Sequence, residues 1–145
     1  MRVYFDTCAI QRPLDGLAQL RVRLEAEAVV SLIELCESGR LELVASAAHR
    51  IENRANPHPD RHAHAVAVLA VAQHYAATTD AVAERAAEYA AAGIGRLDAL
   101  HLASAVVSGA AFFCTTDDRL LRRGRQAETG STAVVSPLEL VQVLP

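Results

Sequence analysis

Val3-Tyr4-Phe5-Asp6-Thr7, at the start of the chain, is a short apolar run that ends in an acid, and Phe113-Cys114-Thr115-Thr116-Asp117 repeats this pattern late in the chain. Short apolar runs of this kind are typical of strands buried in a parallel sheet. In such a sheet the chemistry gathers at the carboxyl ends of the strands, along one edge. The two runs therefore predict an α/β fold that places Asp6 and Asp117 at the same edge.

Strands and helices alternate along the chain. The pattern predicts strands at residues 2–5, 41–45, 111–115 and 133–135. It predicts helices at residues 18–38, 60–75, 80–93, 97–108, 119–123 and 137–143, and one more that Ser46 caps and Asn56-Pro57 ends. This alternation predicts one domain, residues 1–145, with a three-layer α/β/α, Rossmann-like fold around a parallel sheet of about four to five strands.

Composition excludes several classes of protein. All fourteen basic residues are arginine, so the lysine of a phosphate-binding P-loop and the lysine of a Schiff-base enzyme are both missing. No apolar run approaches the ~18 residues of a membrane span. A strand that begins by Val3 leaves no room for a signal peptide, and three widely spaced cysteines without a Cys-x-x-Cys pair are typical of a reducing compartment. We expect a cytoplasmic protein without a membrane partner.

Four acids stand where predicted strands or helices begin or end: Asp6, Glu52, Asp98 and Asp117. Each alone has a structural interpretation, such as an Asx turn at Asp6, a helix-start acid at Asp98 or an exposed pair of Glu52 with a neighbouring arginine. The helix after Asp98 is nearly all apolar, however, which indicates an acid directed at a ligand. Carboxylates gathered at one edge repel one another unless a cation or shared protons compensate, so the sequence raises the question of a divalent metal site.

The charge balance leaves room for a nucleic-acid substrate. The net charge is −3, and the four acids contribute −4, so the rest of the chain carries +1. Arginines follow Asp117 closely, at positions 119, 122, 123 and 125. They are consistent with a solvated basic helix end, or with contacts to RNA phosphates, for which guanidinium groups are well suited. Arg12, in the loop after Asp6, is a second candidate on the same edge.

The order and spacing of these motifs resemble those of PIN-domain ribonucleases, and specifically the VapC-like toxins of bacterial toxin–antitoxin pairs. The resemblance covers residues 3 to 121. Its segments are Val3-Tyr4-Phe5-Asp6-Thr7-Cys8, then Ser46 with Glu52 six residues on, then Leu97-Asp98-Ala99-Leu100-His101-Leu102-Ala103-Ser104-Ala105, and last Phe113-Cys114-Thr115-Thr116-Asp117-Asp118-Arg119-Leu120-Leu121.

The resemblance implies an endoribonuclease that uses Mg²⁺ or Mn²⁺ to cut single-stranded RNA or RNA loops. It implies a homodimer that a co-encoded antitoxin inhibits. The catalytic quartet would be Asp6, Glu52, Asp98 and Asp117, of which Asp6, Asp98 and Asp117 would bind the metal and Glu52 would position water. Substrate contacts would come from the hydroxyl residues Thr7 and Thr115 and from Arg12, Arg119 and Arg122.

Two other functions stay open at this point. A PIN-like domain with little catalysis could bind only RNA or a protein. A phosphoaspartyl protein, either a haloacid-dehalogenase-like phosphatase or a receiver domain, would use Asp6 as nucleophile. The second class depends on a strand-end lysine, which this chain cannot supply, and the phosphatase also expects an Asp-x-Asp motif where the chain has Asp6-Thr7-Cys8. Cys8 also departs from the small polar residue common in PIN domains, and residues 47–51 match the family loosely.

Overall fold

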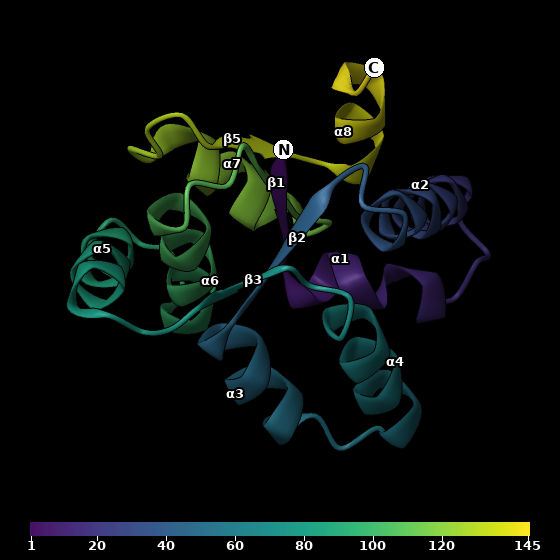
Figure 1. Ribbon diagram of the computed structural model, residues 1–145, viewed down its shortest axis with the longest axis horizontal. Helices are drawn as coiled ribbons and strands as arrows, with labels where there is room; N and C mark the ends of the chain where they lie inside the picture. Colours follow the sequence, from purple (N-terminus) through teal and green to yellow (C-terminus); the bar gives the residue numbers. More distant parts are fainter.

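Five parallel strands form the centre of the structure, a computed structural model that describes residues 1–145 (Figure 1). They lie in the order β3-β2-β1-β4-β5. Their bounds are β1 Arg2–Phe5, β2 Glu42–Ser46, β3 His74–Ala76, β4 Phe112–Cys114 and β5 Ala133–Val135. The chain moves outward from β1 to β2 and β3 on one side, and then crosses to β4 and β5 on the other. The carboxyl ends of β1 and β4 are therefore the topological switch point, where α/β folds open a crevice.

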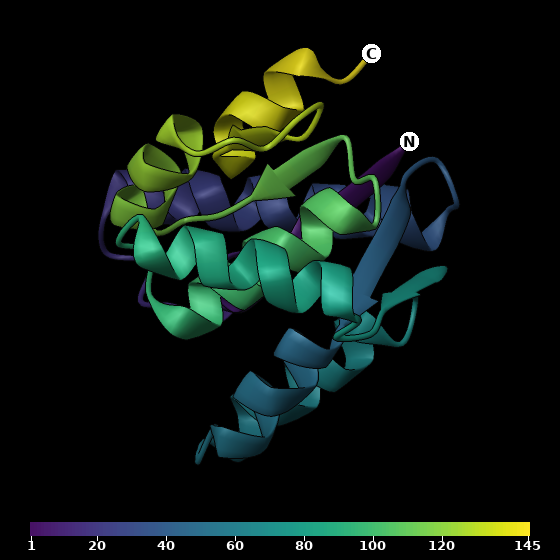
Figure 2. The same ribbon diagram turned by 90° about the vertical axis from the view of Figure 1, so that its left-hand side faces the viewer.

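Helices cover both faces of this sheet, as the three-layer prediction requires. On one face lie α1 (Thr7–Gln11), α2 (Leu20–Glu37), α4 (Pro59–Leu69) and α8 (Pro137–Val143). On the other lie α5 (Asp80–Ala91), α6 (Arg96–Val107) and α7 (Asp118–Gln126). Figure 2 shows α5 and α6 in front of the strands and α2 behind them.

The alternation of side chains along β1 divides the core between the two faces. Val3 and Phe5 pack into the cluster beneath α2 and α8, whereas Tyr4 points into the cluster beneath α5 and α6. This is the two-residue period of a strand buried on both sides. Tyr4 is the one residue of β1 that carries a hydroxyl group into an otherwise apolar layer.

The remaining helix, α3 (Ala47–Ala55), begins directly after β2 and runs with α4 beyond the end of the sheet (Figure 1). Ser46 caps α3 as predicted, and the Ser46 hydroxyl accepts a hydrogen bond from the backbone of His49. The short turn η1 (Arg12–Leu14) follows α1. No helix is both long and apolar enough to span a bilayer.

Two parts of the secondary-structure prediction were wrong. The helix predicted at 60–75 begins at Pro59, with His58 as its cap, and ends at Leu69; residues 74–76 then form the edge strand β3. Gln73 makes this turn possible, because its backbone N–H donates to the Leu43 carbonyl and its side-chain oxygen accepts from the Leu43 N–H. The segment after Asp6, predicted as strand end and loop, forms α1, which Asp6 itself caps.

Candidate active site

The structure brings the four predicted acids to the carboxyl edge of the sheet from four different elements. Asp6 directly follows β1 and caps α1, and Asp117 follows β4 and caps α7. Asp98 lies in the first turn of α6, and Glu52 lies on α3, the helix after β2. Their common neighbour is Cys8, whose pKa is raised to about 12 by burial and then by the negative charges of all four acids.

Asp6 is the buried member of the group, with 2% of its surface exposed. Its Oδ1 accepts from the backbone N–H of Ala9 at 2.8 Å, and its Oδ2 accepts from the hydroxyl of Thr115 at 2.6 Å. Burial raises the pKa of Asp6 to about 7, against the lowering effect of these two hydrogen bonds. The carboxylate is held rigidly but lacks compensation for its charge.

Asp98 and Asp117 are half-buried and interact with each other. Burial raises the pKa of Asp98, and the charge of Asp117 adds to this effect. Asp117 Oδ1 accepts from the backbone N–H groups of Arg119 and Leu120, at 2.9 and 3.1 Å, which satisfies the start of α7. Asp117 Oδ2 and both oxygens of Asp98 form no hydrogen bond within the protein.

Glu52 has a histidine as its partner, not one of the neighbouring arginines. Its Oε1 lies 3.1 Å from His101 Nε2. Burial alone would raise the pKa of Glu52, but its hydrogen bonds with His101 and Thr7 lower it overall. Glu52 therefore loses its proton more readily than Asp6 and Asp98, whose pKa values burial raises.

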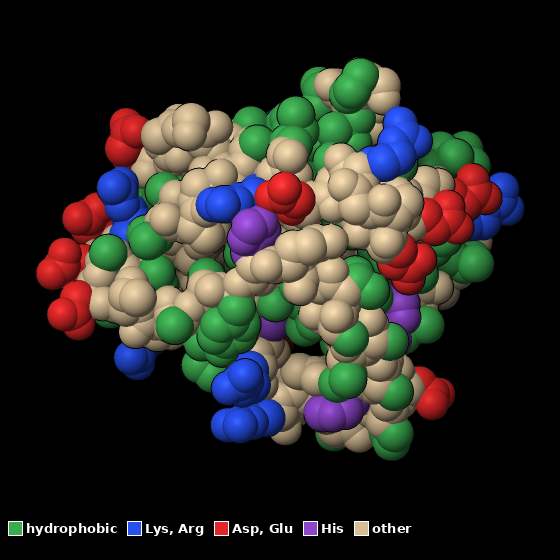
Figure 3. Space-filling model, viewed as in Figure 1, with side chains coloured by type: hydrophobic (Ala, Val, Ile, Leu, Met, Phe, Trp, Pro, Cys, Tyr) green, Lys and Arg blue, Asp and Glu red, His purple; other side chains and the backbone are tan.

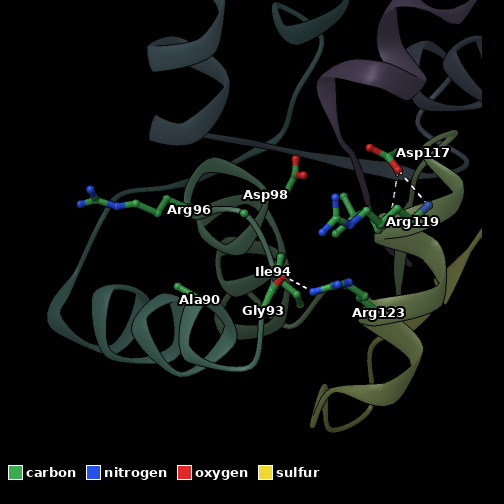
Figure 4. A pocket seen from close by; sticks show the side chains of 10 residues that line it. Ala90, Gly93, Ile94, Arg96, Asp98, Asp117, Arg119 and Arg123 are labelled. Atoms are coloured by element: carbon green, nitrogen blue, oxygen red, sulfur yellow. Dashed lines mark hydrogen bonds between the residues drawn. The ribbon is translucent and has the colours of Figure 1, made fainter.

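Two cavities open on either side of Asp117. The first, of about 410 Å³, lies between the start of α6 and α7, and Figure 4 shows Asp98, Asp117 and Arg119 around it. Arg96 and Arg123 also line it. The second, of about 370 Å³, has mostly polar walls, and its lining includes Thr7, Cys8, Gln11, Arg12, Glu52, Asn56 and Asp117. Asp117 lines both cavities, Asp98 lines the first and Glu52 the second, whereas Asp6 is buried behind them; the two cavities together are called the channel below.

Of the predicted substrate residues, some line a cavity and one, Thr115, is buried. Arg119 is exposed in the first cavity and Thr7 lies in the wall of the second. Thr115 is fully buried and orders the site, because its hydroxyl donates to Asp6 and accepts from the backbone N–H of Asp117 at 3.1 Å. Arg122 lies in a neighbouring cavity of about 500 Å³, beside Arg123.

Arg12 lies at the wall of the second cavity, with its guanidinium occupied inside the protein. It pairs with Glu25 and with Asp15, each at 2.9 Å. Glu25, which is 1% exposed, also pairs with Arg21 at 2.9 Å, and Arg21 in turn pairs with Asp118 at the start of α7. These ion pairs fasten η1 and α2 to the edge of the site.

Sequence reasoning missed two participants. Arg96, the first residue of α6, lines the first cavity two residues before Asp98. Tyr4 bonds to His101 through its hydroxyl at 2.5 Å, and so connects the interior of β1 to the site. The signal for Tyr4 was present, since it is a polar group inside an apolar strand. For Arg96 only its closeness to Asp98 in the chain could have indicated a role.

The acids fit a divalent cation by chemistry. None of Asp6, Asp98 and Asp117 forms an ion pair with a basic side chain, whereas the buried Glu25 has two arginine partners. Carboxylate oxygens are the ligands that Mg²⁺ and Mn²⁺ prefer. In their present rotamers no three acidic, histidine or cysteine side chains lie close enough to hold one ion.

A comparison with family models matches residues 3–126 to the PIN domain. The chain belongs to the PIN domain family. Members of this family are generally nucleases, so family membership supports hydrolysis of phosphodiester bonds.

A solved structure with a similar fold is that of VapBC2 from Rickettsia felis bound to a DNA fragment from its promoter. The match covers 94% of this chain and 98% of the other, with a TM-score of 0.61 and 10% identity. At that identity the likeness concerns the fold. A search of the curated proteins gave no match. The predicted family and the three-layer fold with five parallel strands are thus confirmed for this PIN domain.

Proposed function

We propose that this PIN domain is a Mg²⁺- or Mn²⁺-dependent endoribonuclease that cuts single-stranded or loop RNA, and that it is the toxin of a toxin–antitoxin pair. The observation that carries the proposal is the gathering of four carboxylates from four elements without a basic side chain paired to Asp6, Asp98 or Asp117. A cation would offset the repulsion between charges arranged in this way. Because PIN domains are generally nucleases, the reaction that such a cation would assist is hydrolysis of a phosphodiester bond.

In the proposed mechanism Asp6, Asp98 and Asp117 would hold the ion, with Asp6 fixed by Thr115 and the other two offering free oxygens. The chemistry supplied by a bound ion would be a lower pKa for a bound water and stabilisation of the leaving oxygen. Glu52, which His101 keeps in place, orients the attacking water from the side of the second cavity. No serine, cysteine or histidine nucleophile is needed.

The arginines of the first cavity give the proposed substrate its phosphate contacts. Arg96 and Arg119 are exposed there and pair with no acid of the protein, although Asp98 and Asp117 line the same cavity. Arg122 continues this basic surface along α7. Free guanidinium groups beside a carboxylate cluster are suited to bind the phosphates of an RNA close to the acids. An RNA chain would run through the channel past Asp117.

A protein partner is part of the proposal. The similar fold comes from VapBC2, which was solved bound to promoter DNA, and this supports a cognate antitoxin as the partner here. A homodimer and a cytoplasmic location complete the proposal, in line with the family resemblance and with three free cysteines.

The test is cleavage of a pool of structured and single-stranded RNAs with Mg²⁺ or Mn²⁺. Wild type, Asp98→Asn and Asp80→Asn are compared, since Asp80 is an exposed acid in the first turn of α5 and matches Asp98 in its place on a helix. We expect wild type and Asp80→Asn to cleave equally, and Asp98→Asn or added EDTA to abolish cleavage. Equal cleavage by Asp98→Asn, or cleavage in EDTA, would contradict the mechanism.

One observation favours the alternative of a binding-only PIN domain. As their rotamers stand, no three metal-ligating side chains converge on one point. A domain of this kind would retain RNA binding in the absence of a divalent ion and cut nothing. RNA retained in EDTA with the same affinity as in Mn²⁺, together with no cleavage across the pool, would support this alternative.

A further inference from the structure

We infer that Tyr4 and His101 form a buried relay of hydrogen bonds that positions the Glu52 carboxylate for the reaction. The inference rests on the proposed nuclease function and adds two residues to its machinery. Tyr4 and His101 are both 0% exposed, so neither can touch RNA. They are positioning residues that act through Glu52, the member that reaches the second cavity.

A series of close polar contacts leads from Glu52 to the backbone beside Asp6. Glu52 Oε1 lies 3.1 Å from His101 Nε2, and His101 Nδ1 lies 2.5 Å from the Tyr4 hydroxyl. The Tyr4 hydroxyl lies 2.6 Å from Ser46 Oγ. Ser46 Oγ lies 3.3 Å from His49 Nδ1, and His49 Nε2 lies 2.7 Å from the carbonyl of Phe5, the residue before Asp6.

The chemistry of the groups fixes the direction of each bond. A carboxylate only accepts, so His101 Nε2 carries the proton that it shares with Glu52. In a neutral imidazole Nδ1 is then an acceptor, and the Tyr4 hydroxyl must donate to it.

At the far end of the relay, His49 Nδ1 accepts from the Ser46 N–H at 3.1 Å, so its Nε2 donates to Phe5. Burial lowers the pKa of His49 to about 3, so the ring is neutral. The Tyr4 oxygen accepts from Ser46 Oγ at 2.6 Å, which uses the only proton of that hydroxyl, so Ser46 connects to His49 through its backbone N–H. This order makes Glu52 the end of a rigid chain rather than a mobile side chain on α3.

A purely structural role would not require this arrangement. Apart from Tyr4 and Tyr89, the hydrophobic cluster that contains Tyr4 is built from Val, Ala, Leu, Ile and Phe, and apolar replacements could fill the same space. Buried polar networks are costly unless every member is satisfied, and this one is satisfied only because Glu52 accepts the last bond. The network thus places its single charged group at the polar channel.

Tyr4→Phe tests the relay with little change in packing. We expect kcat for RNA cleavage to fall about 10- to 100-fold, as when partners of metal-site residues are removed, with KM within about 2-fold of wild type. Tyr89→Phe is the matched control, since Tyr89 is buried, donates its hydroxyl to the Glu128 carbonyl at 2.7 Å and lies outside the site. We expect Tyr89→Phe to lose a comparable hydrogen bond and to cleave as wild type does.

A double-mutant cycle shows whether Tyr4 acts through Glu52. In a Glu52→Gln background, Tyr4→Phe should produce no further loss of kcat, because the group that it positions is already disabled. A full additional loss in that background would overturn the relay. Unchanged kcat in Tyr4→Phe, alongside active wild type and Tyr89→Phe, would also overturn it and leave the nuclease proposal standing.

Nitrogen NMR of the histidine rings tests the relay without any cleavage. In wild type the His101 signals, assigned by their absence from His101→Gln, should show a protonated Nε2 and a bare Nδ1. Tyr4→Phe should keep the proton on Nε2, which Glu52 still accepts, and should shift the Nδ1 signal because its hydrogen-bond donor is lost. Protonation on Nδ1 in wild type would overturn the inference, whereas RNA left uncut by wild type with the expected tautomer would count against the nuclease function alone.

Discussion

At the scale of single residues, Asp6 is the acid whose ionised form is most destabilised by burial. Its carboxyl is buried, and its two hydrogen bonds do not offset the cost of removing a charge from water. Thr115 and the N–H of Ala9 nevertheless fix both of its oxygens. An acid that is held rigidly and yet raised in pKa is typical of a functional site.

The raised pKa of Asp6 predicts that the stability of the protein in EDTA depends on pH. Because the folded-state pKa of Asp6 is raised to about 7, the folded state binds the proton more tightly than the unfolded state. The contribution of Asp6 to the free energy of unfolding is therefore present at low pH and is lost as the pH rises toward 7, by about 1.4 kcal/mol per pH unit. Above that pH the loss is complete.

Denaturant titrations of wild type and Asp6→Asn at pH 4.5 and pH 8 measure this effect, since other titrating groups contribute equally to both. We expect wild type to lose stability relative to Asp6→Asn between the two pH values, and Mg²⁺ at pH 8 to stabilise wild type only. If the difference in free energy of unfolding between the two proteins is the same at both pH values, the pKa of Asp6 is not raised by folding.

At the scale of elements, the edge of the site depends on ion pairs between segments far apart in the chain. Glu25 on α2 joins Arg12 of η1 to Arg21, and Arg21 reaches Asp118 at the start of α7. Asp118 therefore stabilises the scaffold, and Asp117, one residue earlier, faces the channel. Backbone N–H groups in the first turn of α7 orient the Asp117 side chain, and the same helix carries the arginines that flank it.

Glu25→Ala should destabilise the protein by about 3 kcal/mol, because it removes the buried acid that joins Arg12 and Arg21 and leaves the half-buried Arg12 with Asp15 alone. Glu27→Ala is the control, since Glu27 is exposed on the same helix and forms no ion pair. We expect it to change stability by less than about 0.5 kcal/mol. Urea unfolding of both variants measures the difference; equal midpoints would contradict the structural role of the network.

The elements that the sequence predicted well are those with strong local signals. The apolar runs of β1 and β4, each ending in an acid, identify strands and the functional edge together. The helix at 60–75 was wrong because Val71 and Ala72 continue an apolar pattern after the helix has ended, and both pack against the core. A three-residue edge strand such as β3 has too few positions to show an alternation of its own.

At the scale of the whole molecule, topology explains why four acids so far apart in the chain meet. The strand order reverses between β1 and β4, and the helices after β1, β2 and β4 begin at the same edge. The sequence could predict this meeting because parallel strands share one functional edge. It could not predict the partner of a particular side chain, such as Glu25 for Arg12 or Tyr4 for His101, because these contacts depend on packing across the layers.

At this scale the surface charges are mixed in sign. Figure 3 shows basic and acidic side chains scattered over one face, with no dominant field of either sign. The chain as a whole carries a net charge of −3, so an RNA would be held by local contacts at the channel rather than by a strongly basic surface. Recognition of this kind depends on the shape of the RNA and on its exposed single-stranded segments.

The most direct test of the central claim is Mn²⁺ binding, measured by calorimetry on metal-free protein. The three proteins are wild type, Asp98→Asn and Asp80→Asn. If the gathered acids form a metal centre, wild type and Asp80→Asn will bind Mn²⁺ with the same affinity, and Asp98→Asn will bind at least about 10-fold more weakly. Equal binding by all three, or no measurable binding by wild type, would contradict the account.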